Sequence, residues 1–336
     1  MRRPRSLKSL PWHDRVGWVR LLLVALGVLL IANACNSASE RTDTTPPTKA
    51  SGDTTPPPTV PDGAFFLDLQ TGEQTPLPSA RVEDSRVRFD EGHYYAVSPD
   101  GSKAYWENTC CSAADMAAVA GSDGSQGRRI DPRGRINYYA GGWSPDSTKI
   151  VYQERDGSGD GIAYGDLVVE DTNSGRKARI DLGPESPESG WWYLAPTFSP
   201  DGRNVIFQLP RGPDGMTKWD LWSVPVSGSK PKLLVKNAAQ AATSESPVWA
   251  FVRPNADFFD GTRLVLATSD GLRPLVEASV GIFEPKMSPD GSKIAYADGD
   301  SIYVVEVSNG ETSEVALGRM AAWFDDDTLI VAPDTG

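Results

Sequence analysis

Aspartate recurs along the chain at positions where it could bind a metal ion. It stands in repeated Pro-Asp-Gly phrases and in two close groups, Asp325 to Asp327 and Asp298 with Asp300. Carboxylate oxygens are the ligands that Ca²⁺ prefers, but neither group has the spacing of an EF-hand loop. An Asp in a Pro-Asp-Gly turn also already accepts hydrogen bonds from the turn backbone. We therefore expect solvated turns at these positions and predict no metal ion or other cofactor.

Histidine is too scarce for most hydrolytic or metal chemistry. The sequence holds two histidines, His13 and His93, and His13 lies in the basic N-terminal segment. A Ser-His-Asp triad would therefore have to use His93, and no Gly-x-Ser-x-Gly nucleophile elbow occurs in the sequence. These residues favour a non-enzymatic protein. The alternative is an enzyme that acts on polysaccharide or peptide with His93 as its base.

Two adjacent cysteines, Cys110 and Cys111, could form a vicinal disulfide in an oxidising compartment. If the third cysteine, Cys35, is modified, these two are the remaining thiols. We expect them to lock a loop. A redox-active or ligand-gripping loop is the alternative.

Aromatic residues stand shortly before several of the repeated turns, where they could bind a partner. Tyr and Trp offer a large contact area together with a polar group. We expect them at the starts of innermost strands around a central opening, and packing between sheets is the alternative role. The candidate binding rim consists of Tyr94, Tyr95, Tyr138, Tyr139, Trp191, Trp192, Tyr193 and Trp249. Residues 191–193 are the strongest candidates, because residues 184–190 before them are typical of an exposed loop.

Short hairpins built on one repeated phrase must position these residues. The phrase Ser-Pro-Asp-Gly and an alternating apolar strand follow one another at residues 288–296, and copies recur along the chain. Proline sets φ at the first turn corner and glycine adopts φ > 0. The turn aspartates, in chain order, are Asp100, Asp146, Asp201, Asp260, Asp290 and Asp326. Apolar residues stand four and six positions after each Asp on one strand face, which predicts that each such strand is buried.

The residues just before these turns predict how the first strand of each hairpin is placed. Large apolar residues directly precede the turn. Mostly small ones stand one position earlier: Ala96, Gly142, Thr197, Lys286 and Ala322. This alternation predicts an innermost strand that lines a narrow axis with one face and packs between sheets with the other.

A second hairpin unit accompanies each hairpin that carries a turn Asp, so we expect about 24 strands. Two hairpins form one four-stranded sheet, and radial repetition of such sheets is typical of a β-propeller. The chain opens with a second unit, 64–77, and closes with a first unit, 321–332. We predict an all-β, six-bladed β-propeller of four-stranded antiparallel blades, closed by pairing of the N-terminal and C-terminal half-blades. The copy at Asp260 is irregular, and its first strand is expected at 247–251.

The Ser-Pro-Asp-Gly phrases resemble the WD40-like PD40 repeats of the TolB-type β-propeller family, over roughly residues 62–336. The resemblance implies the propeller fold and a partner-binding surface around its central channel. TolB carries an α/β domain before its propeller, whereas a different segment stands there in this chain. The chain is therefore similar to the propeller module alone, and such propellers serve very different tasks.

The N-terminal segments predict export and anchoring. Residues 1–35 combine basic residues, an apolar run too short to span a bilayer and small residues, as a secretory signal does. Its end, residues 32–35, resembles a bacterial lipobox with Cys35 as the lipidated residue, although Ala32 stands where lipoboxes usually carry Leu. Plain secretion and an uncleaved signal anchor are the alternatives. Residues 36–62, rich in Ser, Thr and Pro, predict a disordered tether, and residues 63–336 the propeller.

Charge narrows the range of partners. The formal net charge is −12, and the first 35 residues carry six Lys and Arg and one Asp, so the remainder carries about −17. Clustered Lys and Arg are needed to bind phosphate backbones, so nucleic acid is excluded as a partner. We expect an exported, membrane-anchored, monomeric scaffold that binds an unknown envelope protein or peptide. A small-ligand sensor at the channel is a further alternative.

Overall fold

The computed structural model describes residues 63–80, 89–92, 94–108, 116–130, 141–155, 165–182, 194–210, 218–254 and 261–332. These residues form antiparallel strands and one short 3-10 helix, η2 (Phe89–Glu91), with no α-helix among them. In the same ranges, no helix is long and apolar enough to cross a membrane. The predicted all-β class is confirmed.

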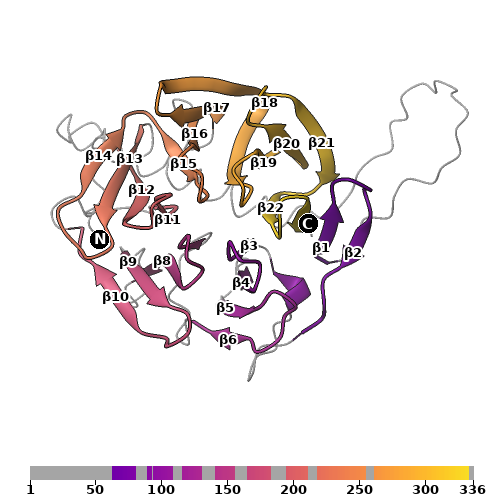
Figure 1. Ribbon diagram of the computed structural model, residues 1–336, viewed down its shortest axis with the longest axis horizontal. Helices are drawn as coiled ribbons and strands as arrows, with labels where there is room; N and C mark the ends of the chain where they lie inside the picture. The colour runs from indigo at the N-terminus through magenta and orange to yellow at the C-terminus, as the bar shows by residue number, and fades with distance from the viewer. Residues whose placement is uncertain are drawn as a thin grey trace, which may run out of the picture. The chain divides into compact units, whose positions relative to one another are not determined.

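Four of the sheets have four strands each, and all the sheets stand around a common centre (Figure 1). The first contains β3 (Tyr94–Val97), β4 (Lys103–Asn108), β5 (Met116–Gly121) and β6 (Arg128–Arg129). The second contains β7 (Gly142–Trp143), β8 (Lys149–Arg155), β9 (Gly165–Asp171) and β10 (Lys177–Ile180). The third contains β11 (Thr197–Phe198), β12 (Asn204–Pro210), β13 (Trp219–Pro225) and β14 (Lys232–Val235).

The fourth of these sheets joins the first and the last described strands. It contains β2 (Gln74–Pro76), β1 (Phe65–Asp68), β23 (Thr328–Ala332) and β22 (Met320–Trp323), in that order. Strand β1 pairs with β23 over four residues, from Phe65 opposite Val331 to Asp68 opposite Thr328. The N-terminal hairpin therefore completes the sheet that the C-terminal hairpin begins.

A seven-stranded sheet occupies the remaining part of the ring. Its strands are β15 (Ala239–Ala242), β16 (Trp249–Arg253), β17 (Gly261–Thr268), β18 (Gly271–Met287), β19 (Lys293–Asp298), β20 (Ser301–Glu306) and β21 (Thr312–Leu317). The first part of β18 pairs with β17, and its last part, from Ile282 to Met287, pairs with β19. One strand of 17 residues thus serves two groups of four strands.

The structure corrects the expected position of one innermost strand. Residues 247–251 were expected to form it, but Trp249–Arg253 is the second strand, β16, which lies between β15 and β17. The innermost strand is β15. The turn after β15 has no Pro-Asp-Gly phrase, and serine hydroxyls support it instead: Ser244 Oγ accepts a hydrogen bond from the backbone N–H of Ser246 (3.2 Å). The Ser-Pro-Asp signal that follows β3, β7, β11 and β18 is therefore absent here.

The periodic apolar positions form the core, as predicted. The residues four positions after each turn Asp are Ala104, Ile150, Val205, Leu264, Ile294 and Ile330, and all are fully buried. The residues two positions further on are at most 4 % exposed. These side chains pack between neighbouring sheets, so the repeated pattern holds the sheets together.

The Ser-Pro-Asp-Gly turns have the hydrogen bonds expected of them. In the first copy, Asp100 Oδ1 accepts hydrogen bonds from Ser98 Oγ (2.6 Å) and from the backbone N–H of Ser102 (3.0 Å). Ser98 Oγ also accepts the N–H of Lys103 (3.0 Å), and Gly101 has a φ of 70°. The copies at residues 144–146, 199–201 and 288–290 repeat the bond from the serine hydroxyl to the carboxylate. Each turn is thus closed by its own side chains.

Candidate functional site

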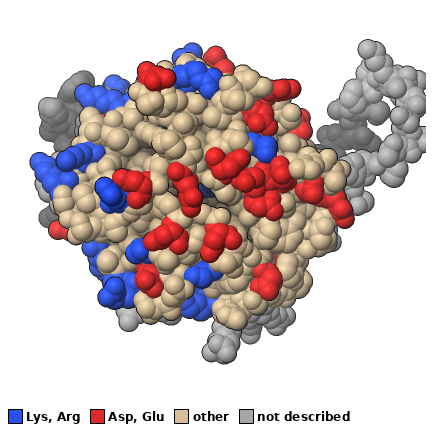
Figure 2. Space-filling view, in the orientation of Figure 1, with Lys and Arg blue, Asp and Glu red and all other residues tan. Residues whose placement is uncertain are grey.

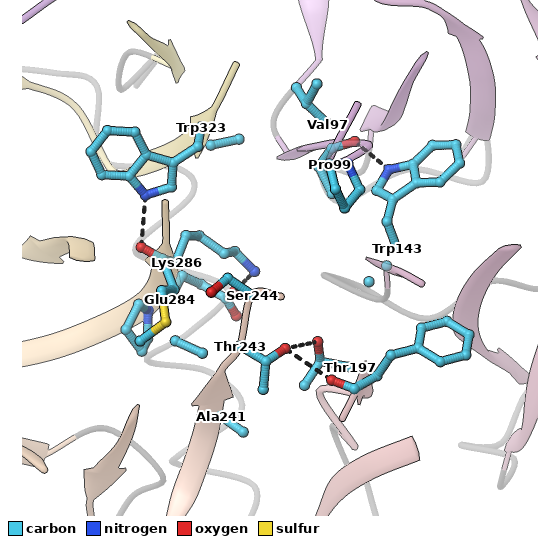
Figure 3. A pocket seen from close by; sticks show the side chains of 18 of the residues that line it. Val97, Pro99, Trp143, Thr197, Ala241, Thr243, Ser244, Glu284, Lys286 and Trp323 are labelled. Carbon is cyan, nitrogen blue, oxygen red and sulfur yellow. Dashed lines mark hydrogen bonds and ion pairs between the residues drawn. The ribbon is translucent and has the colours of Figure 1, made fainter. Parts of the chain in front are cut away.

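A cavity of about 140 Å³ lies where the innermost strands come together (Figure 3). Residues of β3, β7, β11, β15, β18 and β22 line it, and residues of the turns that follow these strands border it at one end, here called the mouth. The five residues predicted to face a central axis all line this cavity: Ala96, Gly142, Thr197, Lys286 and Ala322. Small side chains at most of these positions leave the space open. The large residues that directly precede the turns, among them Trp143 and Trp323, border the cavity as well.

Hydrogen bonds between neighbouring sheets hold the cavity wall in place. Trp143 Nε1 donates to the carbonyl oxygen of Ala96 (2.7 Å), and Trp323 Nε1 donates to that of Lys286 (2.8 Å). Both tryptophans stand directly before a turn, one residue after a wall position, and Figure 3 shows their indoles reaching across to the next strand. The large residues predicted to pack between sheets therefore also fix the wall backbone.

Two threonines give the wall a hydrogen-bond acceptor. Thr243 Oγ1 donates its single proton to the carbonyl oxygen of Phe198 (2.9 Å). The contact between Thr197 Oγ1 and Thr243 Oγ1 (3.1 Å) must then use the proton of Thr197, because a hydroxyl has only one to give. Thr197 Oγ1 therefore faces the cavity as an acceptor.

Lys286 is the charged member of the wall positions. Its Nζ lies 2.9 Å from Glu284 Oε2, 2.9 Å from the Tyr94 hydroxyl and 4.7 Å from the centre of the Tyr94 ring. The Tyr94 hydroxyl in turn donates to the carbonyl oxygen of Gly141 (2.7 Å). The Lys286 side chain is 26 % exposed and that of Glu284 only 5 %. The Lys286 side chain is thus more accessible from the cavity than the Glu284 carboxylate.

The protonation states of this cluster are stable near neutral pH. Burial alone would lower the pKa of Lys286, but the charge of Glu284 and the contact with Tyr94 outweigh it and raise the pKa above its ordinary value. Burial raises the pKa of Tyr94 to about 12, although Lys286 opposes the shift. General acid–base catalysis works best when the pKa is close to the working pH. The cluster is therefore suited to binding and orienting a group, and poorly suited to moving protons.

Carboxylates surround the mouth. Figure 2 shows acidic side chains gathered about the central hollow and basic ones mostly nearer the edge of this face. The exposed turn acids next to the cavity lining are Asp100, Asp146, Asp201, Glu245, Asp290 and Asp325. Burial opposes ionisation of Asp100 and Asp146, but hydrogen bonds from turn hydroxyls and N–H groups outweigh it and lower each pKa to about 2. The mouth is thus negatively charged at neutral pH. Within the described ranges, no three His, Cys, Asp or Glu residues are placed to hold a metal ion.

The structure brings together only part of the candidate binding rim. Tyr94 and Tyr95 both line the cavity, but they are 1 % and 3 % exposed, and the Tyr95 hydroxyl bonds to the carbonyl oxygen of Phe89. Trp249 lies on β16, where its ring packs against Phe251, and it is not among the residues that line the cavity. The remaining candidates lie outside the described residues: Tyr138, Tyr139, Trp191, Trp192, Tyr193, His93, Cys35, Cys110 and Cys111.

The sequence pattern did not predict the pair of Lys286 and Glu284. Lys286 stands in a column of small residues, and it is the charged member of that column. Glu284 lies two residues earlier in β18, and although the strand is irregular there, its Oε2 lies 2.9 Å from Lys286 Nζ. That exception to the pattern is the signal that could have revealed the pair.

Similarity to solved structures identifies the fold. TolB from Acinetobacter baumannii matches with a TM-score of 0.52 at 13% identity, over 80% of this chain and 63% of that chain. The tricorn protease also matches with a TM-score of 0.52 at 13% identity, over 81% of this chain and 29% of that one. The fold is a β-propeller. The chain spans less than two thirds of the length of either neighbour. No family model matches the sequence, and no curated protein matches it.

Proposed function

We propose that this β-propeller is a non-enzymatic scaffold that binds a protein or peptide at its central cavity. The cavity itself carries the proposal: small residues on five of the six innermost strands keep it open, and Lys286 of the sixth points into it. Propeller folds host unrelated activities, so the argument rests on the site and not on the fold. A partly exposed lysine that stays charged and a buried tyrosine that stays neutral support binding over catalysis.

The finer architecture is part of the same proposal. We infer six blades of four strands, because β18 serves two groups of four strands and the sheet with β1 and β23 completes the sixth. The repeated bond between the serine hydroxyl and the Asp carboxylate supports the assignment of the turns to PD40 repeats. Pairing of β1 with β23 covers the edge that each of these strands would otherwise leave free.

The proposal also includes export and attachment. The basic and apolar residues before Cys35 support a secretory signal, and lipidation of Cys35 would hold the propeller at the outer side of a membrane on a tether of residues 36–62. Mass spectrometry of the mature N-terminus tests this: an acylated Cys35 supports the anchor. An unmodified N-terminus or an intact signal would instead support secretion or a signal anchor.

Site-specific photo-cross-linking in cells tests the binding function. A photoreactive amino acid replaces Ala241 on the cavity wall, and a second variant carries it at Leu233, which is 41 % exposed on the outer strand β14. We expect a discrete cross-linked product from position 241 and none from position 233. Products that are the same at both positions, or missing at 241, would contradict a partner in the cavity.

A further inference from the structure

The position of Lys286 shows that the fold itself does not require a charge there. The equivalent wall residues on the other innermost strands are Ala96, Gly142, Thr197, Ala242 and Ala322, all small and uncharged. A buried ion pair is weak evidence for stability, because desolvation of both charges offsets their attraction. The pair of Lys286 and Glu284 therefore needs another explanation than packing, and its position in the cavity suggests a ligand.

The geometry of Lys286 leaves it able to bind an acceptor. An ammonium group has three N–H donors. Glu284 Oε2 and the Tyr94 hydroxyl engage two of them at 2.9 Å each. About a quarter of the Lys286 side chain remains exposed, whereas Glu284 lies almost entirely below the surface. Figure 3 shows the Lys286 amine directed into the cavity. A carboxylate entering the cavity would thus meet a preoriented cation.

The surroundings of Lys286 set the charge pattern of a fitting ligand. Lys286 stands two residues before Ser288, at which the turn begins, so its backbone lies about 7 Å inside the mouth along the strand. The turn acids above it, among them Glu245 and Asp290, are exposed and negative. A wholly anionic ligand would be repelled at the mouth. A ligand with an anionic tip followed by cationic groups would complement both Lys286 inside the cavity and the carboxylates at the mouth.

We propose that the cavity binds the C-terminal end of a partner polypeptide, with its carboxylate on Lys286 and basic side chains a few residues earlier among the mouth carboxylates. This rests on the proposed function and names the chemistry of its partner. A chain end is favoured over an internal loop because a cavity of about 140 Å³ admits one strand end-on more readily than two. Thr197 Oγ1 offers an acceptor for an N–H group of the bound segment.

Selection from a synthetic peptide library tests this without knowledge of the partner. Random N-acetylated pentapeptides, half with a free C-terminal carboxylate and half amidated, are passed over the immobilised full chain and identified by mass spectrometry. We expect free acids to be enriched about tenfold over amides, as one charge-assisted hydrogen bond predicts, with Lys or Arg before the terminus. Equal enrichment of both forms, enrichment of amidated peptides with internal Asp or Glu, or no enrichment would each overturn the proposal.

Matched variants separate the site from general charge effects. Lys286→Met combined with Glu284→Gln removes both charges at nearly constant volume, so that no unpaired buried carboxylate remains to unfold the protein. It should abolish the preference for free acids, and Lys286→Arg should retain it. Glu245→Lys should reduce the preference for basic residues, whereas Lys232→Met, on the outer strand β14, should change nothing. If cross-linking at position 241 succeeds while the free-acid preference is missing, the binding function stands and the carboxylate proposal falls.

Discussion

At the scale of single residues, Lys286 and Glu284 depend on one another. Glu284 is 5 % exposed, so removal of its partner leaves a buried carboxylate without its counter-ion. Loss of one member of a buried pair costs several kcal/mol, and the partial exposure of Lys286 places this case at the low end. We predict that Lys286→Met lowers the free energy of unfolding by about 2–3 kcal/mol, and that adding Glu284→Gln recovers most of the loss. Urea denaturation measures both. Equal stabilities of single and double variants would contradict the coupling.

The turn aspartates make stability depend on acid pH. Burial opposes the ionisation of Asp146, but hydrogen bonds, first from Ser144, lower its pKa to about 2 from an ordinary 3.8. A carboxyl with a lowered folded-state pKa contributes stability that is present above the unfolded-state pKa and lost as pH falls through the folded-state pKa. We predict a loss of thermal stability between about pH 4 and pH 2. Ser144→Ala should raise the pKa of Asp146, which carboxyl-carbon NMR measures. It should also reduce the loss of thermal stability at acid pH. An unchanged pKa would show that Ser144 is not the cause.

At the scale of the strand, side-chain amides connect the second strand β12 to the innermost strand β15, and β15 to β18. Gln208 Oε1 accepts the N–H of Gln240 (2.9 Å), and Gln240 Oε1 accepts the N–H of Glu284 (2.6 Å). Gln240 and Glu284 both have φ of 49°, a left-handed conformation in which the strand ladder is interrupted. The amide oxygens therefore accept hydrogen bonds from buried N–H groups that have no partner in the strand ladder.

Gln240→Met tests these links, because it keeps the length of the side chain and removes the acceptor for Glu284 N–H. A buried donor left without a partner costs about 1–3 kcal/mol. We predict a loss of about 2 kcal/mol in the free energy of unfolding, measured with urea. Gln74→Met on β2 is the matched control and should change stability by no more than about 0.5 kcal/mol. A similar loss in both variants would mean that the amide link contributes nothing specific.

The strands also show what the sequence could and could not predict. Turn phrases and alternating residues located the buried positions and the cavity wall, because those features depend on local φ and on strand period. Strand β15 was misplaced because its turn relies on Ser244 and not on Pro-Asp-Gly. The burial of Tyr95 depends on a contact with Phe89 from outside its own strand, which no local pattern encodes. No local pattern encodes the contact of Lys286 with Tyr94 either, because the two residues are 192 positions apart.

At the scale of the whole molecule, the two ends of the propeller depend on each other through β1 and β23. The register from Phe65 opposite Val331 to Asp68 opposite Thr328 buries Phe65, Leu329 and Val331 almost completely. Without β1, strand β23 would present a free edge and an apolar face, and both features promote aggregation.

Deletion of residues 1–77, which removes β1 and β2, tests whether this pairing closes the ring. We predict a lower thermal midpoint, a less cooperative transition and concentration-dependent association, followed by calorimetry and sedimentation. Deletion of residues 1–58 is the control, since the compact unit begins at Thr59, and it should melt as the full chain does. Adding residues 59–77 back as a separate peptide should restore part of the midpoint, because the missing hairpin can pair with β23 from outside. A deleted chain that stays monomeric with an unchanged midpoint would show that the sheets cohere without their N-terminal hairpin.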